Sequence, residues 1–86
     1  MSRQRSMEVI EQSEYVTIGE LVRLTGVMRY STLKFYTEEG MLPFEQAEEN
    51  LTRRYRREES IEMIYKIRKM REEKMTIPEI KGKIKG

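Results

Sequence analysis

The first clear pattern of apolar and polar positions lies in residues 18–25. The apolar side chains of this stretch recur every three or four positions and so share one helical face. Thr17 stands just before it and Glu20 three positions later, as in a capping box, where each side chain accepts a hydrogen bond from an amide at the helix start. Gly26 readily takes the left-handed conformation that helix ends often need. The pattern predicts a short helix over about residues 18–25.

A second helical pattern follows closely, over residues 31–39. Leu33 and Tyr36 lie three positions apart, so they can face inward together. Gly40 is placed to end this helix as its left-handed exit, and Pro43 prevents the helix from resuming. Two short helices joined by a tight glycine turn are typical of a helix-turn-helix.

The segment after the second helix has no helical period. Residues 41–44 and residues 51–55 can pair as a small β-hairpin across the polar loop at residues 47–50. A hairpin of this size is not stable alone. Packed against a helix-turn-helix, it would form a wing.

The longest predicted helix runs from residue 58 to about residue 73. Apolar residues recur along it at helical spacing, namely Ile61, Met63, Ile64, Ile67 and Met70. Met63, Met70 and Met75 suit gap filling in a core better than a ligand site, because methionine is flexible and apolar.

A last short helix is expected after Thr76, its predicted cap. Pro78 falls in its first turn, and Ile77 and Ile80 are the expected buried positions. Together these elements predict a mainly α fold, a winged helix-turn-helix with about four helices and a small β-hairpin wing. We assign this domain to residues 15–86 and interpret residues 1–14 as a flexible N-terminal arm that is helical in part.

The residue inventory is poor for catalysis and for metal binding. Cysteine and histidine do not occur, and all the acidic residues are glutamates. The usual general base and the commonest transition-metal ligands are therefore missing. The sequence predicts no enzyme, no metal site and no cofactor. It has no apolar run of the roughly 20 residues that span a bilayer and no signal-peptide pattern, so the expected location is the cytoplasm, without a membrane partner.

Charge is distributed unevenly along the 86 residues. Residues 1–50 carry five Lys or Arg and nine Glu, a net charge of −4, whereas residues 51–86 carry twelve Lys or Arg and six Glu, a net charge of +6. Four arginines lie within five positions around Tyr55, namely Arg53, Arg54, Arg56 and Arg57. Their counter-charge could be a solvated helix end, an acidic protein, a membrane surface or nucleic acid, and the basic half favours nucleic acid.

The order of several motifs resembles the DNA-binding domain of MerR-type transcriptional regulators. The chain has YVTIGE at 15–20, LTGV at 24–27, STLKFYTEEGMLP at 31–43, RRY at 53–55 and MREEKMTIPEIK at 70–81. The resemblance implies a winged helix-turn-helix whose second helix enters the major groove while wing arginines contact phosphates.

The resemblance also implies a set of DNA-contacting residues on the helix-turn-helix and the wing. They are Thr17, Arg29, Tyr30, Ser31, Lys34, Tyr36, Arg53, Arg54, Tyr55 and Arg56. Core packing is an equally good interpretation for Tyr36 and Tyr55, because tyrosine can do both. The alternative interpretation of Arg56 and Arg57 is that they are solvent-exposed residues at the start of the long helix, without a contact to DNA.

Double-stranded DNA is the implied partner, and RNA polymerase is a second candidate partner. The chain could bind DNA as a homodimer or as copies side by side. The leading function is sequence-specific DNA binding in transcriptional regulation. An architectural, excisionase-like or DNA-packaging accessory role is the alternative, and a protein-interaction module is a third.

Some positions depart from the family pattern. The turn at residues 26–31 is one residue longer than usual and has Met28 where a serine cap is common, Leu51 replaces a wing glycine, and Lys74 replaces a glycine. Typical members continue into a long dimerising helix and an effector domain, which we do not expect in a sequence that stops at Gly86.

Overall fold

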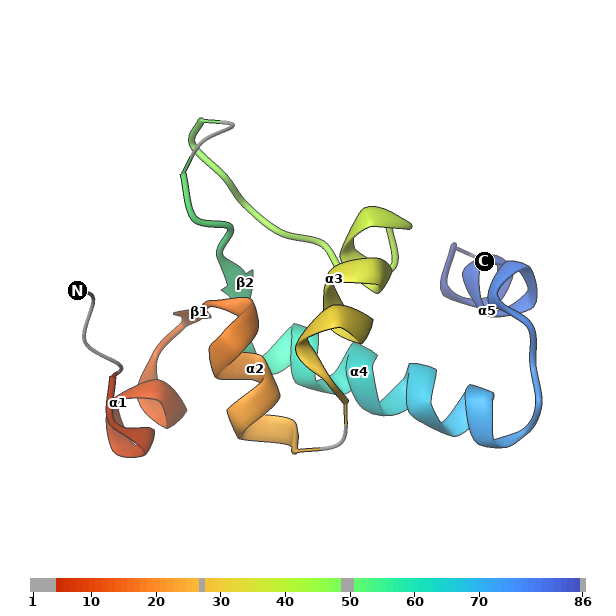
Figure 1. Ribbon diagram of the computed structural model, residues 1–86, viewed down its shortest axis with the longest axis horizontal. Helices are drawn as coiled ribbons and strands as arrows, with labels where there is room; N and C mark the ends of the chain where they lie inside the picture. The colour runs from red at the N-terminus through yellow and green to blue at the C-terminus, as the bar shows by residue number, and fades with distance from the viewer. Residues whose placement is uncertain (1–4, 27, 49–50, 86) are drawn as a thin grey trace.

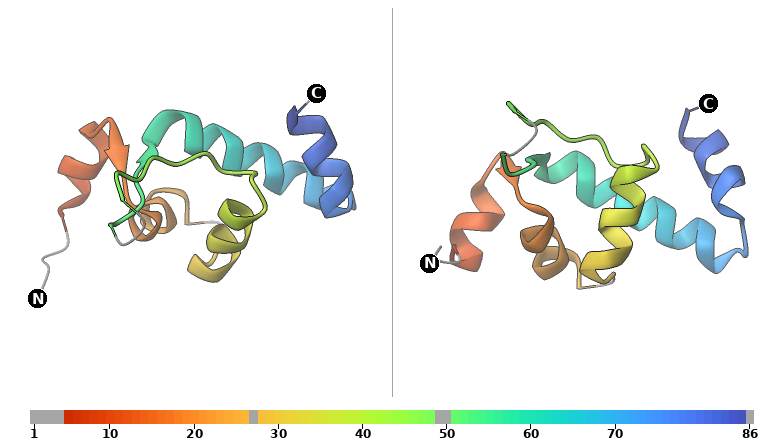
Figure 2. Two further views of the ribbon diagram at one scale, coloured as in Figure 1. Left: turned by 90° about the horizontal axis from the view of Figure 1, so that it is seen from above. Right: turned by 45° about the horizontal axis from the view of Figure 1, so that its top comes forward.

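The computed structural model describes residues 5–26, 28–48 and 51–85 and consists mainly of helices (Figure 1). In chain order its elements are α1 (Met7–Gln12), β1 (Tyr15–Val16), α2 (Ile18–Thr25), α3 (Tyr30–Glu38), β2 (Tyr55–Arg56), α4 (Arg57–Glu72) and α5 (Ile77–Lys85). Seen from above, α4 runs along one side of the molecule and α3 protrudes on the other (Figure 2). α2 packs against both of them. The predicted winged helix-turn-helix architecture is confirmed, with α1 as an additional helix.

The start of α2 has the predicted capping box. The Glu20 amide donates to Thr17 Oγ1 over 3.2 Å, and the Thr17 amide donates to Glu20 Oε1 over 2.9 Å. Gly26 ends the helix with φ of 63°. Because this local chemistry fixes both ends, α2 spans the predicted residues 18–25.

The helix α3 begins and ends one residue earlier than predicted. It ends in a Schellman motif: the Gly40 amide donates to the Thr37 carbonyl over 3.1 Å, and the Met41 amide donates to the Tyr36 carbonyl over 2.9 Å. Gly40 has φ of 78°, so the predicted left-handed exit is confirmed. The motif turns the chain sharply and directs Met41 and Leu42 into the core, where both are 1% exposed.

One core joins the helices to the sheet. The buried apolar residues are Ile10, Val16, Leu21, Leu33, Tyr36, Met41, Leu42, Tyr55, Ile64, Ile67 and Ile80. Met63, Met70 and Met75 pack around it, as predicted. In α5, Ile80 is fully buried, whereas Ile77 is only partly buried, contrary to expectation.

The strand pairing differs from the predicted hairpin. Among the residues of this segment that the structure describes, Glu45 and Arg54 alone form a bridge, with two backbone hydrogen bonds of 2.8 Å each. β2 pairs instead with β1, antiparallel, so that Tyr55 lies opposite Val16. The hairpin is shorter than predicted because residues 41–42 are part of the core. The predicted loop residues 49 and 50 lie outside the described residues.

The segment interpreted as a flexible arm includes α1, which packs on α2. Ile10 is fully buried in the core. The Arg5 guanidinium donates from Nε to Glu20 Oε2 over 2.8 Å and from Nη2 to Glu20 Oε1 over 2.7 Å. Residues 5–14 contain too few apolar residues to show a helical period. The sequence therefore did not indicate that Ile10 is buried in the core. Residues 5–14 thus contain a helix that packs on the domain and contributes Ile10 to its core. Residues 1–4 lie outside the description.

The end of α4 forms a second Schellman motif, with lysine where glycine is usual. The Lys74 amide donates to the Arg71 carbonyl over 3.0 Å, and the Met75 amide donates to the Met70 carbonyl over 3.1 Å. Lys74 has φ of 68°. It is the one non-glycine residue with a left-handed conformation among the residues that the structure describes. A Cβ in this conformation crowds the following carbonyl and costs about 1 kcal/mol.

Lys74→Gly is expected to stabilise the fold by about 0.5–1 kcal/mol, because the relieved strain exceeds the entropy that glycine loses on folding. Urea unfolding followed by circular dichroism measures the change. Lys74→Ala is the matched control, since it removes the charge and keeps the Cβ. An equal gain for both variants would trace the effect to charge and contradict the conformational explanation.

Glu20 links folding stability to pH. The hydrogen bond from Arg5 lowers the pKa of this carboxyl below its usual 4.5, with further help from Thr17 and against an opposing effect of burial. Near pH 4.5 the unfolded chain therefore binds more protons than the folded one. The contribution of Glu20 to stability is complete above that pH and is lost as the pH falls through the folded pKa.

Glu20→Gln is expected to lower stability at pH 7 by about 1 kcal/mol, because the charge-assisted bonds to Arg5 and the capping box weaken. The variant should also lose less stability than the native chain between pH 7 and pH 3.5. Urea unfolding at both pH values tests this, with Glu62→Gln on the exposed side of α4 as the control. Equal pH dependence in the native chain and the Glu20 variant would contradict it.

Candidate nucleic-acid interface

The outer face of α3 is exposed along its whole length. Its exposed side chains follow the four-residue repeat of a helix and are Tyr30, Ser31, Lys34, Phe35 and Glu38. The opposite face is anchored by three buried residues, Leu33, Tyr36 and Thr37. Because α3 protrudes from the body (Figure 2), this face is available to a groove-shaped partner. It includes three of the residues predicted to contact DNA.

Three arginines, one from the cap of α3 and two from α4, line a depression at the start of α3. An open depression there is lined by Met28, Arg29, Thr32, Tyr36, Arg68, Arg71 and Glu72. Arg29 occupies the cap position of α3, and its side chain makes no capping bond to the first amides. Guanidinium groups beside free helix amides form an environment that suits a phosphate. Arg68 and Arg71 were not predicted as part of this site. Their spacing of three places them on one face of α4, but the sequence does not indicate that this face lies next to α3.

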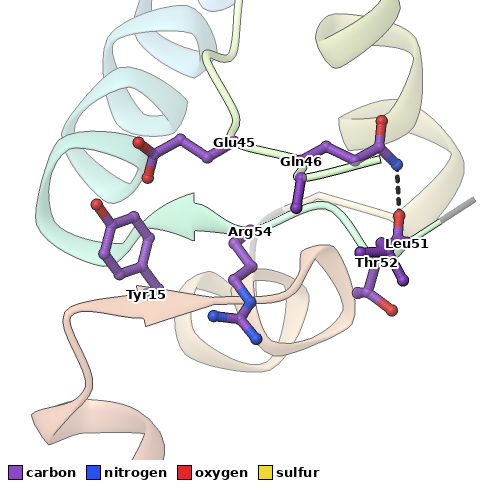
Figure 3. A pocket seen from close by; sticks show the side chains of 7 residues that line it. Tyr15, Glu45, Gln46, Leu51, Thr52 and Arg54 are labelled. Carbon is purple, nitrogen blue, oxygen red and sulfur yellow. Dashed lines mark hydrogen bonds between the residues drawn. The ribbon is translucent and has the colours of Figure 1, made fainter. Parts of the chain in front are cut away.

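The wing displays two of the four clustered arginines. The Arg53 guanidinium lies 4.7 Å from the ring centroid of Phe44, which itself stands 6.2 Å from the ring of Tyr55. Arg54 is exposed and lies beside the pocket drawn in Figure 3. Neither arginine forms an ion pair with any residue that the structure describes. Both positive charges therefore remain available to an external anion.

Two side-chain hydrogen bonds stabilise the segment that carries these arginines. The Tyr15 hydroxyl points toward the Glu45 carboxylate (Figure 3), and this hydrogen bond is the largest cause of the raised pKa of Tyr15. Gln46 Nε2 donates to the Leu51 carbonyl across the loop (Figure 3). The first bond therefore connects the wing to β1, and the second connects the two sides of the wing loop.

The other two clustered arginines make internal contacts. Arg57 donates from Nε to the Ser13 carbonyl over 2.8 Å, and its backbone amide donates to the Glu14 carbonyl over 2.9 Å. Arg56 lies 5.6 Å from the Tyr15 ring and 4.0 Å from the carboxylates of Glu14 and Glu59. Arg57 therefore ties α4 to the segment before β1. Arg56 is exposed and its contacts are long, so it can still turn to an anion.

The two tyrosines with alternative interpretations are both buried. Tyr36 is 5% exposed, and Tyr55 is fully buried with its hydroxyl 2.8 Å from Thr37 Oγ1. Thr37 Oγ1 donates its own proton to the Leu33 carbonyl over 2.8 Å, so Tyr55 is the donor in the bond to Thr37. This environment favours the packing interpretation for Tyr55, because a phosphate cannot reach its hydroxyl without opening the core. Thr17, the remaining predicted contact, is partly exposed at the start of α2.

Within residues 5–26, 28–48 and 51–85, no group of three His, Cys, Asp or Glu side chains is placed to hold a metal ion. In the same part of the chain, no helix has both the length and the apolar character needed to cross a bilayer. The surface therefore presents an exposed face of α3, with arginines around the depression at the start of that helix.

Comparison with known proteins identifies this arrangement. The model of a family described as MerR HTH family regulatory protein matches residues 16–86. No curated protein and no solved structure matches the chain. Helix-turn-helix domains of this family bind double-stranded DNA in transcription regulation, and the family is non-enzymatic in general. Since the match includes α2, α3, β2, α4 and α5, the chain belongs to the MerR family of helix-turn-helix regulatory proteins.

Proposed function

We propose that this protein binds specific sequences in double-stranded DNA and thereby regulates transcription, with α3 in the major groove and the wing on the phosphate backbone. One observation carries the proposal. The exposed face of α3 has Arg29, Arg68 and Arg71 around the depression at its start. The wing adds Arg54, which is exposed, and Arg53, which is partly exposed. A B-form major groove is wide enough for one helix, and its two phosphate strands lie where flanking cations can reach them.

The proposed roles follow from side-chain chemistry. Lys34 and Ser31, on the exposed face of α3, can donate hydrogen bonds to base edges. Arg53, Arg54 and Arg56 supply phosphate contacts, which position the protein and make its affinity depend on salt. Thr17 and Tyr30 supply further contacts at the helix starts. Regulation at a promoter places RNA polymerase nearby, and two copies on adjacent sites would increase the contact area with DNA.

One observation favours an architectural role as the second candidate. Leu51 is 48% exposed on the wing, close in sequence to Arg53 and Arg54. An apolar residue beside phosphate-binding cations can wedge between base pairs and bend the duplex. Electrophoretic phasing of bound duplexes measures such a bend, and an unbent complex would leave regulation by specific binding as the better interpretation.

Selection of the purified chain against a pool of randomised duplexes at about 0.15 M salt tests the main proposal. Enrichment of one motif is the expected outcome, because the α3 face offers donors to base edges. A repeated or palindromic motif would also show how copies assemble. Binding confined to low salt, without any enriched motif, would contradict specific recognition.

A further inference from the structure

Phe35 occupies the middle of the exposed face of α3 and has no polar group to offer DNA. Its side chain is 45% exposed, and its described ring contact is with Tyr36 at 5.8 Å between centroids. Lys34 precedes it, and Ser31 lies one helical turn earlier on the same face. Nearly half of this aromatic side chain is exposed, and Phe35 belongs neither to the buried core nor to the partly buried residues that pack against it, so core packing does not explain its position.

The major groove contains one common apolar group, the 5-methyl group of thymine. A phenylalanine carried into that groove by its helix can pack against this methyl, and neither base-edge donors nor phosphates give the ring a comparable contact. Lys34 and Ser31 would meanwhile bind polar atoms of neighbouring bases.

We propose that Phe35 is a specificity-determining residue that recognises the 5-methyl group of a thymine in the bound site. This inference rests on the proposed function, because it requires α3 to lie in the major groove. It goes further by assigning one base feature to one side chain. The preference for thymine then arises from burial of a methyl group and requires no hydrogen bond.

Replacing single thymines by deoxyuridine removes only the methyl group and tests the inference on the native protein. In the duplex motif obtained by selection, one such replacement is expected to weaken binding roughly four-fold, the loss expected for about one buried methyl group. Phe35→Ala should weaken binding to the thymine duplex by a similar factor and should show no further loss with uracil at that position. Phe35→Leu should retain part of the discrimination, because leucine remains apolar.

Tyr65→Ala is the matched control, because Tyr65 is an aromatic residue of similar exposure, 44%, on α4 rather than α3. This variant should discriminate thymine from uracil as the native chain does. If the native chain selects a motif but tolerates uracil at every position, or if Phe35→Ala still discriminates, the inference is overturned while specific binding stands. The inference would also be overturned if Phe35→Ala had a lower mass than the native chain in sedimentation and still discriminated thymine from uracil. Phe35 would then be assigned to a contact between copies of the chain. Failure of the native chain to select any motif would overturn the proposed function itself.

Discussion

Replacing Arg53 and Arg54 together by alanine is expected to weaken DNA binding by roughly 100-fold near 0.15 M salt. Each arginine is free to make a charge-assisted bond to a phosphate, and such a bond is worth about 1.5 kcal/mol or roughly tenfold in affinity. The slope of log affinity against log salt should fall by about 1.8, because two fewer counterions are released. Fluorescence anisotropy with the selected duplex over a range of salt concentrations measures both quantities.

Lys66→Ala with Lys69→Ala is the matched control, because it removes the same charge from exposed positions of α4 that do not line the depression shared with α3. This variant should lose little affinity at 0.15 M salt. Circular dichroism should show both double variants folded, although removing Arg53 also removes its contact with Phe44. Equal losses in the two double variants would mean that the wing has no special role and that net charge alone drives binding.

Tyr55→Ala is expected to cost about 3–5 kcal/mol of folding stability, the largest effect that we expect from one substitution. The side chain is fully buried, pairs in register with Val16 of β1 and bonds through its hydroxyl to Thr37 of α3. Its truncation leaves a large cavity where the wing, the sheet and α3 meet. A domain of 86 residues has only about 4–13 kcal/mol of stability in total. Much of the variant should therefore unfold at low urea concentrations, as circular dichroism would show.

Tyr55→Phe separates the hydroxyl from the ring. It keeps the ring packed and removes one donor to Thr37, so a loss of about 1 kcal/mol is expected. DNA affinity of this variant under folding conditions should stay near the native value, because the buried hydroxyl cannot reach a phosphate. If Tyr55→Phe lost as much DNA affinity as the Arg53→Ala and Arg54→Ala double variant, the result would favour a direct contact between Tyr55 and DNA.

Local signals predicted those elements whose ends are fixed by neighbouring residues. The capping box at Thr17 and Glu20 and the left-handed exit at Gly26 set α2, and a second box formed by Thr76 and Glu79 starts α5. In each case, the stabilising bond joins residues three or four positions apart, so the sequence displays both partners together. The order of the motifs likewise indicated the family.

Contacts between distant residues were not predictable in this way. The pairing of Tyr55 with Val16 and the bond of Arg5 to Glu20 connect segments far apart in the chain. The division of the arginine cluster is of the same kind: Arg57 turns inward to Ser13, whereas Arg54 faces outward. A charge pattern shows that cations are concentrated, but it does not show which of them find carbonyls within the fold.

The sequence by itself determined the helix-turn-helix, its caps and its family, because helix periodicity and capping act over one or two turns. Only the tertiary structure decided that α1 belongs to the body, that Tyr55 is a core residue and that Arg68 and Arg71 join Arg29 beside α3. Those outcomes depend on which helix faces meet. That choice is made when the whole core buries its apolar surface together, and no short stretch of residues specifies it.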